Sequence, residues 1–234
     1  MNSLKIKPII VLILNIILSV SLCIINVFYQ LPAPKWDLTL KFIGSGICVL
    51  LGVLNLLFGI LNKKSNCNFA ITMVVGLFLS FGGDIAIEYN FIAGAGLFAL
   101  AHICYVVGFF FISKFHWLDI AITVAFAIPS TLLIGLLPVF NFNPPLLKYV
   151  VIIYAVIISC MFGKSLSNCI RERSFHSILI FIGALMFVLS DFFLLLELFT
   201  SLGWKFGHPC MALYFPALLV FGYSIYYSNK NLLK

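Results

Sequence analysis

Charged side chains are scarce in this chain. Only 9% of its 234 residues are Asp, Glu, Lys or Arg, whereas 63% are hydrophobic. A soluble domain of this length is about one quarter charged and about half apolar. The composition therefore excludes a soluble globular protein and leaves almost nothing of the chain for a soluble domain.

Several motifs that identify common enzymes are also missing. The sequence has no HExxH, no GxSxG and no GxxxxGK[ST] motif, which argues against a zinc protease, a serine hydrolase and a P-loop nucleotide-binding protein. Its seven cysteines include no CxxC pair, and their odd number cannot be fully paired within one chain. We therefore expect neither a disulfide framework nor a structural metal.

Long apolar runs take the place of these motifs. A membrane-spanning helix needs about 20 mostly apolar residues. Eight segments qualify, so the sequence predicts an all-α membrane protein, a bundle of eight transmembrane helices that forms a single integral membrane domain over residues 1–234. The predicted segments are Pro8–Phe28, Leu38–Leu61, Phe69–Ile87, Phe91–Ile112, Trp117–Leu137, Leu146–Lys164, Phe175–Leu198 and His208–Tyr227.

The basic residues predict the orientation of this bundle. Ten Lys and Arg residues fall on the N-terminal side of the predicted spans and four on the opposite side, which accounts for all 14. The positive-inside rule then places both termini in the cytoplasm, in the plasma membrane if the source is bacterial. Because these charges are scattered through short loops, the net charge of +7 does not indicate a nucleic-acid partner.

Two aspartates lie deep inside the apolar segments. Asp84 follows Gly76 by eight residues, and Asp191 follows Gly183 by eight. A carboxylate inside a bilayer costs roughly 2.5–3.5 kcal/mol on insertion scales, so an intramembrane acid is expected to be functional. Both acids lie about 15 residues from the predicted cytoplasmic start of their helices, which is roughly 22 Å into the membrane, in its outer half.

The matched spacing extends to histidine. His102 follows Asp84 by 18 residues, and His208 follows Asp191 by 17. The acids are 107 residues apart, with four helices between equivalent positions, so the pattern is compatible with two parallel four-helix repeats, residues 1–112 and 113–234.

Further polar residues accompany the two acids. Tyr105 lies three residues after His102, on the same helix face, so both side chains can address one polar cavity. Asp84, Asp191 and the two histidines could in principle ligate zinc. With only four histidines and no clustered cysteines in the chain, we expect no metal site and no cofactor.

A pair of carboxylates suits reactions that pass through an oxocarbenium-like transition state. One acid delivers a proton, and the other stabilises the cation or activates water. A membrane hydrolase is therefore one reading of the pair. A proton-coupled transporter of small molecules or lipids is the leading alternative, because intramembrane acids also serve proton relays. A structural or lipid-binding protein is the third.

The residues around the two acids resemble a known family. The Gly83-Asp84 segment, the run from Gly96 through His102 to Tyr105 and the Leu189-Ser190-Asp191 segment resemble the YhhN family, whose animal members are lysoplasmalogenases. The resemblance implies a hydrolase that cleaves the vinyl ether bond of lysoplasmalogen. The products are a fatty aldehyde and glycerophosphoethanolamine or glycerophosphocholine, and the family's two essential aspartates match Asp84 and Asp191.

The resemblance and the polar residues together define an expected site. Asp84 and Asp191 are the expected catalytic residues, one as the acid and one as the stabiliser of the cation. The expected substrate-binding residues are His102, Tyr105, Lys41, His208 and Tyr214, with Lys41, Lys205 or His208 meeting the lipid phosphate. The sequence departs from the family at Lys41-Phe42 and after Tyr214, which leaves the headgroup open, and it does not determine the oligomeric state.

Overall fold

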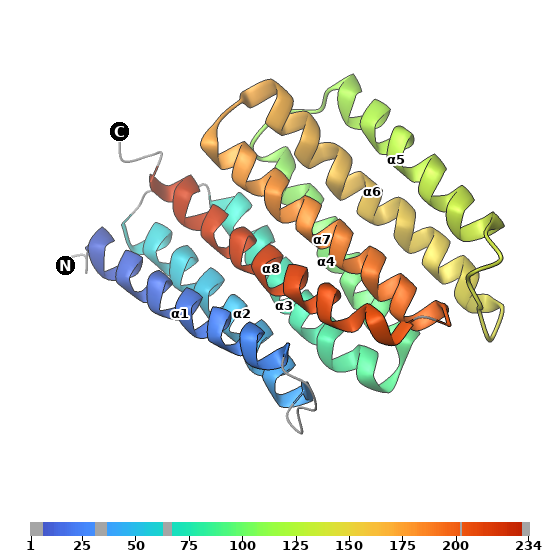
Figure 1. The fold of residues 1–234 in the computed structure, drawn as a ribbon. Coiled ribbons are helices and arrows are strands. Elements are labelled where there is room, and N and C mark those ends of the chain that lie inside the picture. The colour runs from blue at the N-terminus through green and yellow to red at the C-terminus, as the bar shows by residue number, and fades with distance from the viewer. Residues whose placement is uncertain (1–6, 31–36, 63–66, 202, 231–234) are drawn as a thin grey trace.

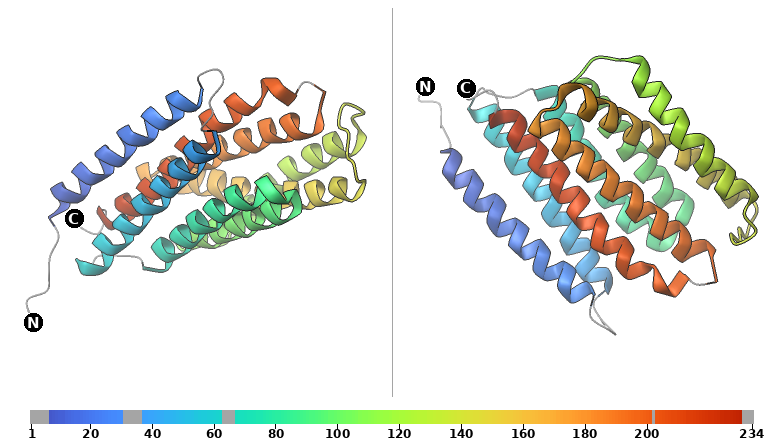
Figure 2. Two further views of the ribbon diagram at one scale, coloured as in Figure 1. Left: turned by 90° about the horizontal axis from the view of Figure 1, so that it is seen from below. Right: turned by 45° about the horizontal axis from the view of Figure 1, so that its top comes forward.

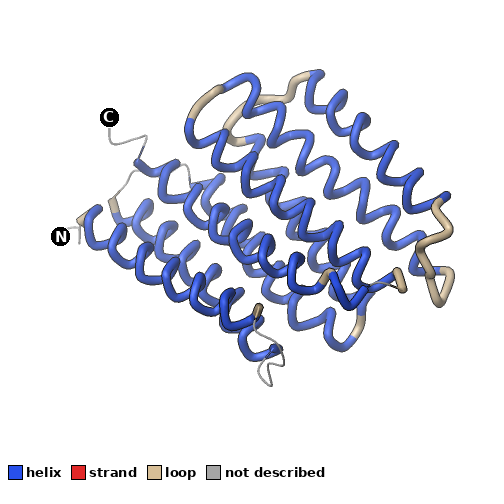
Figure 3. The backbone as a smooth tube through the Cα atoms, in the orientation of Figure 1, coloured by secondary structure: helices blue, strands red, loops and turns tan. Residues whose placement is uncertain are grey.

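The computed structural model describes residues 7–30, 37–62, 67–201 and 203–230. Within these ranges every regular element is a helix (Figure 3). The elements in chain order are α1 (Pro8–Tyr29), α2 (Asp37–Leu61), α3 (Cys67–Tyr89), α4 (Phe91–Phe110), α5 (Trp117–Leu136), α6 (Leu146–Glu172), α7 (Phe175–Phe199), the 3-10 turn η1 (Gly203–Lys205) and α8 (Gly207–Lys230).

The eight α-helices of the described residues are all long and apolar enough to cross a membrane. The prediction of an all-α bundle of eight transmembrane helices is confirmed, and the chain is a multi-pass membrane protein. Helix α1 begins and α8 ends at the same end of the bundle (Figure 1), as an even number of spans requires. That this end faces the cytoplasm stays a prediction.

One predicted boundary is wrong by eight residues, whereas the others lie within three residues of the structure. We expected the sixth span to end at Lys164, but α6 continues to Glu172. Its polar last turns remain helical because neighbouring helices satisfy them. The Lys164 ammonium lies 2.9 Å from the Asp119 carboxylate at the start of α5, and the Asn168 amide donates to the Phe109 carbonyl oxygen in α4. Sequence hydropathy registers the polarity of these side chains but not their partners.

The helices differ in how much of their surface the protein covers. Helices α1 and α5 lie at opposite edges of the bundle (Figures 1 and 2). Only 17% of the apolar window of α1 and 11% of that of α5 is buried, against 56% for α8. Because the edge helices are apolar and largely uncovered, most of their surface faces lipid.

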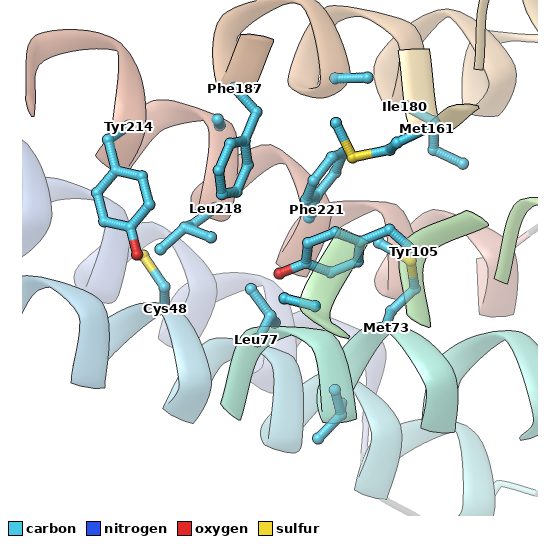
Figure 4. Close-up of a cluster of buried hydrophobic side chains, with 14 of the residues drawn as sticks. Cys48, Met73, Leu77, Tyr105, Met161, Ile180, Phe187, Tyr214, Leu218 and Phe221 are labelled. Carbon is cyan, nitrogen blue, oxygen red and sulfur yellow. The ribbon is translucent and has the colours of Figure 1, made fainter. Parts of the chain in front are cut away.

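The α3–α4 and α7–α8 hairpins form the centre and face each other across a layer of rings (Figure 4). The Phe187 ring on α7 lies with its centroid 4.7 Å from that of His102 and 5.5 Å from that of Tyr214. The Tyr105 ring lies 4.6 Å from that of Phe221. This aromatic layer fixes the spacing between the two hairpins.

Two glycines allow the helices of each hairpin to approach closely. A Cβ atom at Gly76 would collide with the Tyr105 ring, and one at Gly183 would lie 2.8 Å from Cε1 of Phe221. The α3–α4 interface therefore corresponds to the α7–α8 interface. Similarly, α2 packs against α8 while α6 packs against α4. This correspondence supports two parallel repeats, although the division at residues 112 and 113 stays a prediction.

Candidate active site

Asp84 lies on α3 within a group of hydrogen-bond donors. Its side chain is buried, and its Oδ2 accepts hydrogen bonds from the hydroxyl groups of Ser45 on α2 and Tyr214 on α8, the second at 2.7 Å. The Lys41 ammonium lies 4.0 Å from Oδ1. Donors and a cation around a carboxylate stabilise its negative charge.

The ammonium of Lys41 is shared between two acids. It lies 2.7 Å from the Glu88 carboxylate, one helical turn beyond Asp84 on α3. Lys41 is buried, whereas the Glu88 side chain is about one third exposed. We expected the Lys41 ammonium to meet the lipid phosphate, but in this structure it contacts two carboxylates.

Asp191 lies on α7 in a different setting. Its Oδ2 accepts a hydrogen bond of 2.5 Å from the Tyr154 hydroxyl on α6 and lies 3.4 Å from Nε2 of His102 on α4. The same His102 nitrogen is 2.8 Å from the Tyr154 oxygen. The three side chains form a compact triangle that joins three helices.

The two acids receive their partners from corresponding helices. Asp84 on α3 is contacted from α2 and α8, and Asp191 on α7 is contacted from α6 and α4. The chemical types differ, because Asp84 has a lysine beside it and Asp191 has a histidine and a tyrosine. The two aspartates are therefore contacted from corresponding helices, but by side chains of different chemical type.

Both acids line one small cavity, which we call the carboxylate cavity. Lys41, Phe98, Ser190 and Tyr214 are among its other walls. The volume in which the centre of a water molecule could lie is about 20 Å³. Since one water molecule needs roughly 10–15 Å³ by this measure, the cavity has room for about one water between two carboxylates.

Two apolar cavities adjoin the carboxylate cavity at Asp191. One, between α4 and α7, is lined by residues such as Phe91 and Leu198 and has about 50 Å³ by the same measure. The other, with about 130 Å³, lies between α5 and α7 over α6. Asp191 lines all three cavities, so its carboxylate stands where polar and apolar space meet.

The structure brings together some of the predicted binding residues and separates others. Lys41 and Tyr214 contact Asp84, and His102 contacts Asp191. Tyr105 instead lies in the aromatic core, where its hydroxyl is 3.0 Å from that of Ser80, and it does not line the carboxylate cavity. His208 is exposed at the start of α8, also outside this cavity.

Sequence reasoning missed two residues that touch the acids, Ser45 and Tyr154. Tyr154 occurs in a run of aliphatic residues, and Ser45 lies between two glycines in an apolar helix. Neither position carries a motif or a spacing that separates it from other serines and tyrosines. Only the packing of α2 on α3 and of α6 on α7 reveals them.

A metal site is not formed by the described residues, where no group of three or more His, Cys, Asp or Glu side chains could hold an ion. The zinc set considered from sequence, Asp84, Asp191, His102 and His208, does not form such a group. What the arrangement offers is two carboxyl groups that accept hydrogen bonds, a lysine shared between Asp84 and Glu88, and space for water beside apolar cavities.

Of three comparisons with known proteins, one found a match. No curated protein and no solved structure matches the chain. The family model described as the YhhN family matches residues 45–225. This stretch runs from α2 to α8 and includes both Asp84 and Asp191. Because the match covers most of its length, the chain belongs to the YhhN family.

Proposed function

We propose that this protein is a membrane hydrolase that cleaves the vinyl ether bond of lysoplasmalogen. The products are a fatty aldehyde and a glycerophospho-alcohol, such as glycerophosphoethanolamine or glycerophosphocholine. The observation that carries the proposal is the carboxylate cavity, in which Asp84 and Asp191 share space for about one water molecule. The adjoining apolar cavities suit the alkenyl chain of such a lipid.

The reaction needs only proton transfers and one water. An acid protonates the β-carbon of the vinyl ether, and the α-carbon becomes an oxocarbenium ion. Water adds to that carbon and gives a proton to a carboxylate, which leaves a hemiacetal. Cleavage of the bond to the glycerol oxygen then yields aldehyde and alcohol, as the hydroxyl proton of the hemiacetal passes to the glycerol oxygen. The proton given to the β-carbon stays in the aldehyde, and the proton taken from water returns to the acid. One water is consumed, and no cofactor takes part.

The surroundings of the two acids suggest their roles. Lys41 supplies a counter-charge to Asp84, so we assign Asp84 as the ionised group that stabilises the cation and takes the proton of water. Asp191 borders both apolar cavities, where the alkenyl carbons would lie, so we assign it as the acid. Tyr154 and His102 would orient its carboxyl group.

Aldehyde release by the purified full-length protein tests the proposal. The matched control substrate is the saturated alkyl-ether lysolipid, which has the same chain and headgroup but no double bond to protonate. We expect aldehyde from the vinyl ether and none from the control. Absence of aldehyde, together with proton-driven uptake of lipid or small molecules into vesicles that contain the protein, would favour the transporter alternative.

A further inference from the structure

The cavity between α5 and α7 has the form of a groove along α6. Helix α5 packs against α6 and makes no direct helix contact with α7, so the two walls stand apart over the α6 floor. With about 130 Å³, the groove has more than twice the open space of the other apolar cavity at Asp191. We call it the α5–α7 groove.

The lining of this groove suits hydrocarbon. Its walls include Phe126, Ile134, Ile158 and Val188. Its two serine hydroxyls are already used within their own helices, because that of Ser159 donates to the Ala155 carbonyl oxygen at 2.6 Å and that of Ser130 to the Phe126 carbonyl oxygen at 2.8 Å. Away from Asp191 and Tyr154, the walls therefore present no polar group in need of a partner.

The groove has a polar pair partway along it and an aromatic pair at one end. Along α6 its lining runs from Val151 through Tyr154 to Phe162. Tyr154 and Asp191 form the polar pair, and Phe126 and Phe162, with their ring centroids 4.2 Å apart, form the aromatic pair. Eight residues of α6 separate Tyr154 from Phe162, a distance of roughly 12 Å along a helix. A chain that starts at the Asp191 carboxylate and follows α6 would meet this aromatic pair.

We infer that the α5–α7 groove holds the hydrocarbon chain of the lipid substrate and that Phe162, in the aromatic pair at one end, limits the length of chain it accepts. The inference rests on the proposed function for the identity of the lipid. Its physical basis is that Asp191 must reach the first carbons of the chain, and this groove is the largest apolar space that borders Asp191.

Substitutions along α6 test the chain-length limit. Phe162→Ala should shift the preferred substrate to longer chains, with about a fourfold gain in kcat/KM for each added methylene that becomes buried. Ser159→Phe should block the middle of the groove, lowering kcat/KM for long chains about tenfold or more while sparing short chains. Retained turnover of short chains shows that these proteins are folded. Val156→Phe, on the exposed side of α6, is the matched control and should leave the profile unchanged.

A photoreactive lipid separates this inference from the proposed function. The probe is a saturated alkyl-ether lysolipid with a diazirine at the end of its chain, which cannot be hydrolysed by this reaction. We expect the label on Phe126, Phe162 or their neighbours. If the probe labels the groove but the protein releases no aldehyde from lysoplasmalogen, the groove assignment stands and the proposed hydrolase function is wrong. Aldehyde release with the label confined to α1 or to the exposed side of α6, or with an unchanged profile for Phe162→Ala, would overturn the groove assignment.

Discussion

Tyr154 donates a hydrogen bond of 2.5 Å to Asp191, which ties α6 to α7 at the junction of the three cavities. The distance is in the range of hydrogen bonds between a hydroxyl and a carboxylate. Tyr154, which is itself in contact with His102, helps to fix the orientation of the Asp191 carboxyl group, because His102 contacts that group as well. It thereby couples the packing of three helices to the position of the proposed acid.

Tyr154→Phe should lower turnover while the protein remains folded. The change removes one hydroxyl and keeps the ring. Asp191 becomes a carboxylate as it gives up its proton, and a hydrogen bond to a charged group is worth about 1.5–3 kcal/mol, so we expect a loss of roughly 10- to 100-fold in kcat. The measurement is aldehyde release at saturating lysoplasmalogen. Tyr149→Phe, at an exposed site on the same helix, is the control and should have full activity. Equal activity of the two variants would remove Tyr154 from the site.

Asp84→Asn and Asp191→Asn should each reduce turnover by about 10²–10⁴-fold, as is typical when an acid or base is removed. The amide keeps the shape of the side chain but neither donates the proton nor carries the charge. Insertion into the membrane should be retained, because a neutral amide costs less there than a carboxylate. Near-normal aldehyde release by a folded Asp191→Asn protein would exclude that residue as the acid.

The double variant shows whether the two acids act as one unit. Groups that serve a single reaction are not additive, so the double variant should be little slower than the slower single variant. Rate losses that simply multiply would indicate separate functions. Full aldehyde release by both single variants would instead rule out the two-carboxylate mechanism.

The fold could be predicted from sequence because membrane spans are encoded locally. Each needs a long apolar run, and the runs are separated by short polar or proline-containing segments. The end of α6 could not be predicted this way. Lys164 and Asn168 look like loop residues until their partners in the α5 start and the α4 end are known.

The candidate site shows the same division. Asp84 and Asp191 stand out in the sequence because a buried charge is costly wherever it is placed. Ser45 and Tyr154 carry no such cost, since each can donate to a carbonyl oxygen or pack as a neutral side chain. His102 was expected near an acid, but nothing in the spacing indicates that it contacts Asp191 of the second half rather than Asp84 of the first.

Gly76→Ala should destabilise the protein. The added methyl group would collide with the Tyr105 ring, which is fully buried and held by its contact with Ser80. Overpacking of this kind costs typically about 1–3 kcal/mol. Thermal unfolding in detergent should show a lower midpoint for this variant. Gly96→Ala is the control, because a Cβ atom at Gly96 meets no atom within 4 Å.

The control should match or exceed the stability of the unmodified protein, since alanine is about 1 kcal/mol better than glycine inside a helix. Gly183→Ala should behave like Gly76→Ala because its methyl group would meet the Phe221 ring. Similar midpoints for Gly76→Ala and Gly96→Ala would show that the α3–α4 interface is looser than described.

Reporters fused to the chain test the predicted orientation. Ten basic residues against four place both termini in the cytoplasm. A reporter that fluoresces only in the cytoplasm should be active at either terminus, and one that works only outside the cell should be inactive there. The reverse pattern would place the carboxylate cavity in the inner half of the membrane and leave its chemistry unchanged.

The contact of Lys41 with two carboxylates predicts energetic coupling between Lys41 and Glu88. Lys41→Met leaves Asp84 and Glu88 without a nearby ammonium, so it should lower both the unfolding midpoint and the rate of aldehyde release. Glu88→Gln alone should have a smaller effect on stability, because this side chain is about one third exposed. In the double variant the repulsion between the acids is weaker, and part of the lost stability should return.

A double-mutant cycle on unfolding measures this coupling. Residues in direct contact usually differ from additivity by about 0.5–3 kcal/mol. Lys148→Met is the control, because the Lys148 ammonium donates to the Gly135 carbonyl oxygen on α5 and should not couple to Glu88. The changes in unfolding free energy for Lys148→Met and Glu88→Gln should be additive. If those for Lys41→Met and Glu88→Gln are additive too, the ion pair does not hold Lys41 in place. Lys41 would then be free to leave Glu88 for a lipid phosphate, as expected from the sequence.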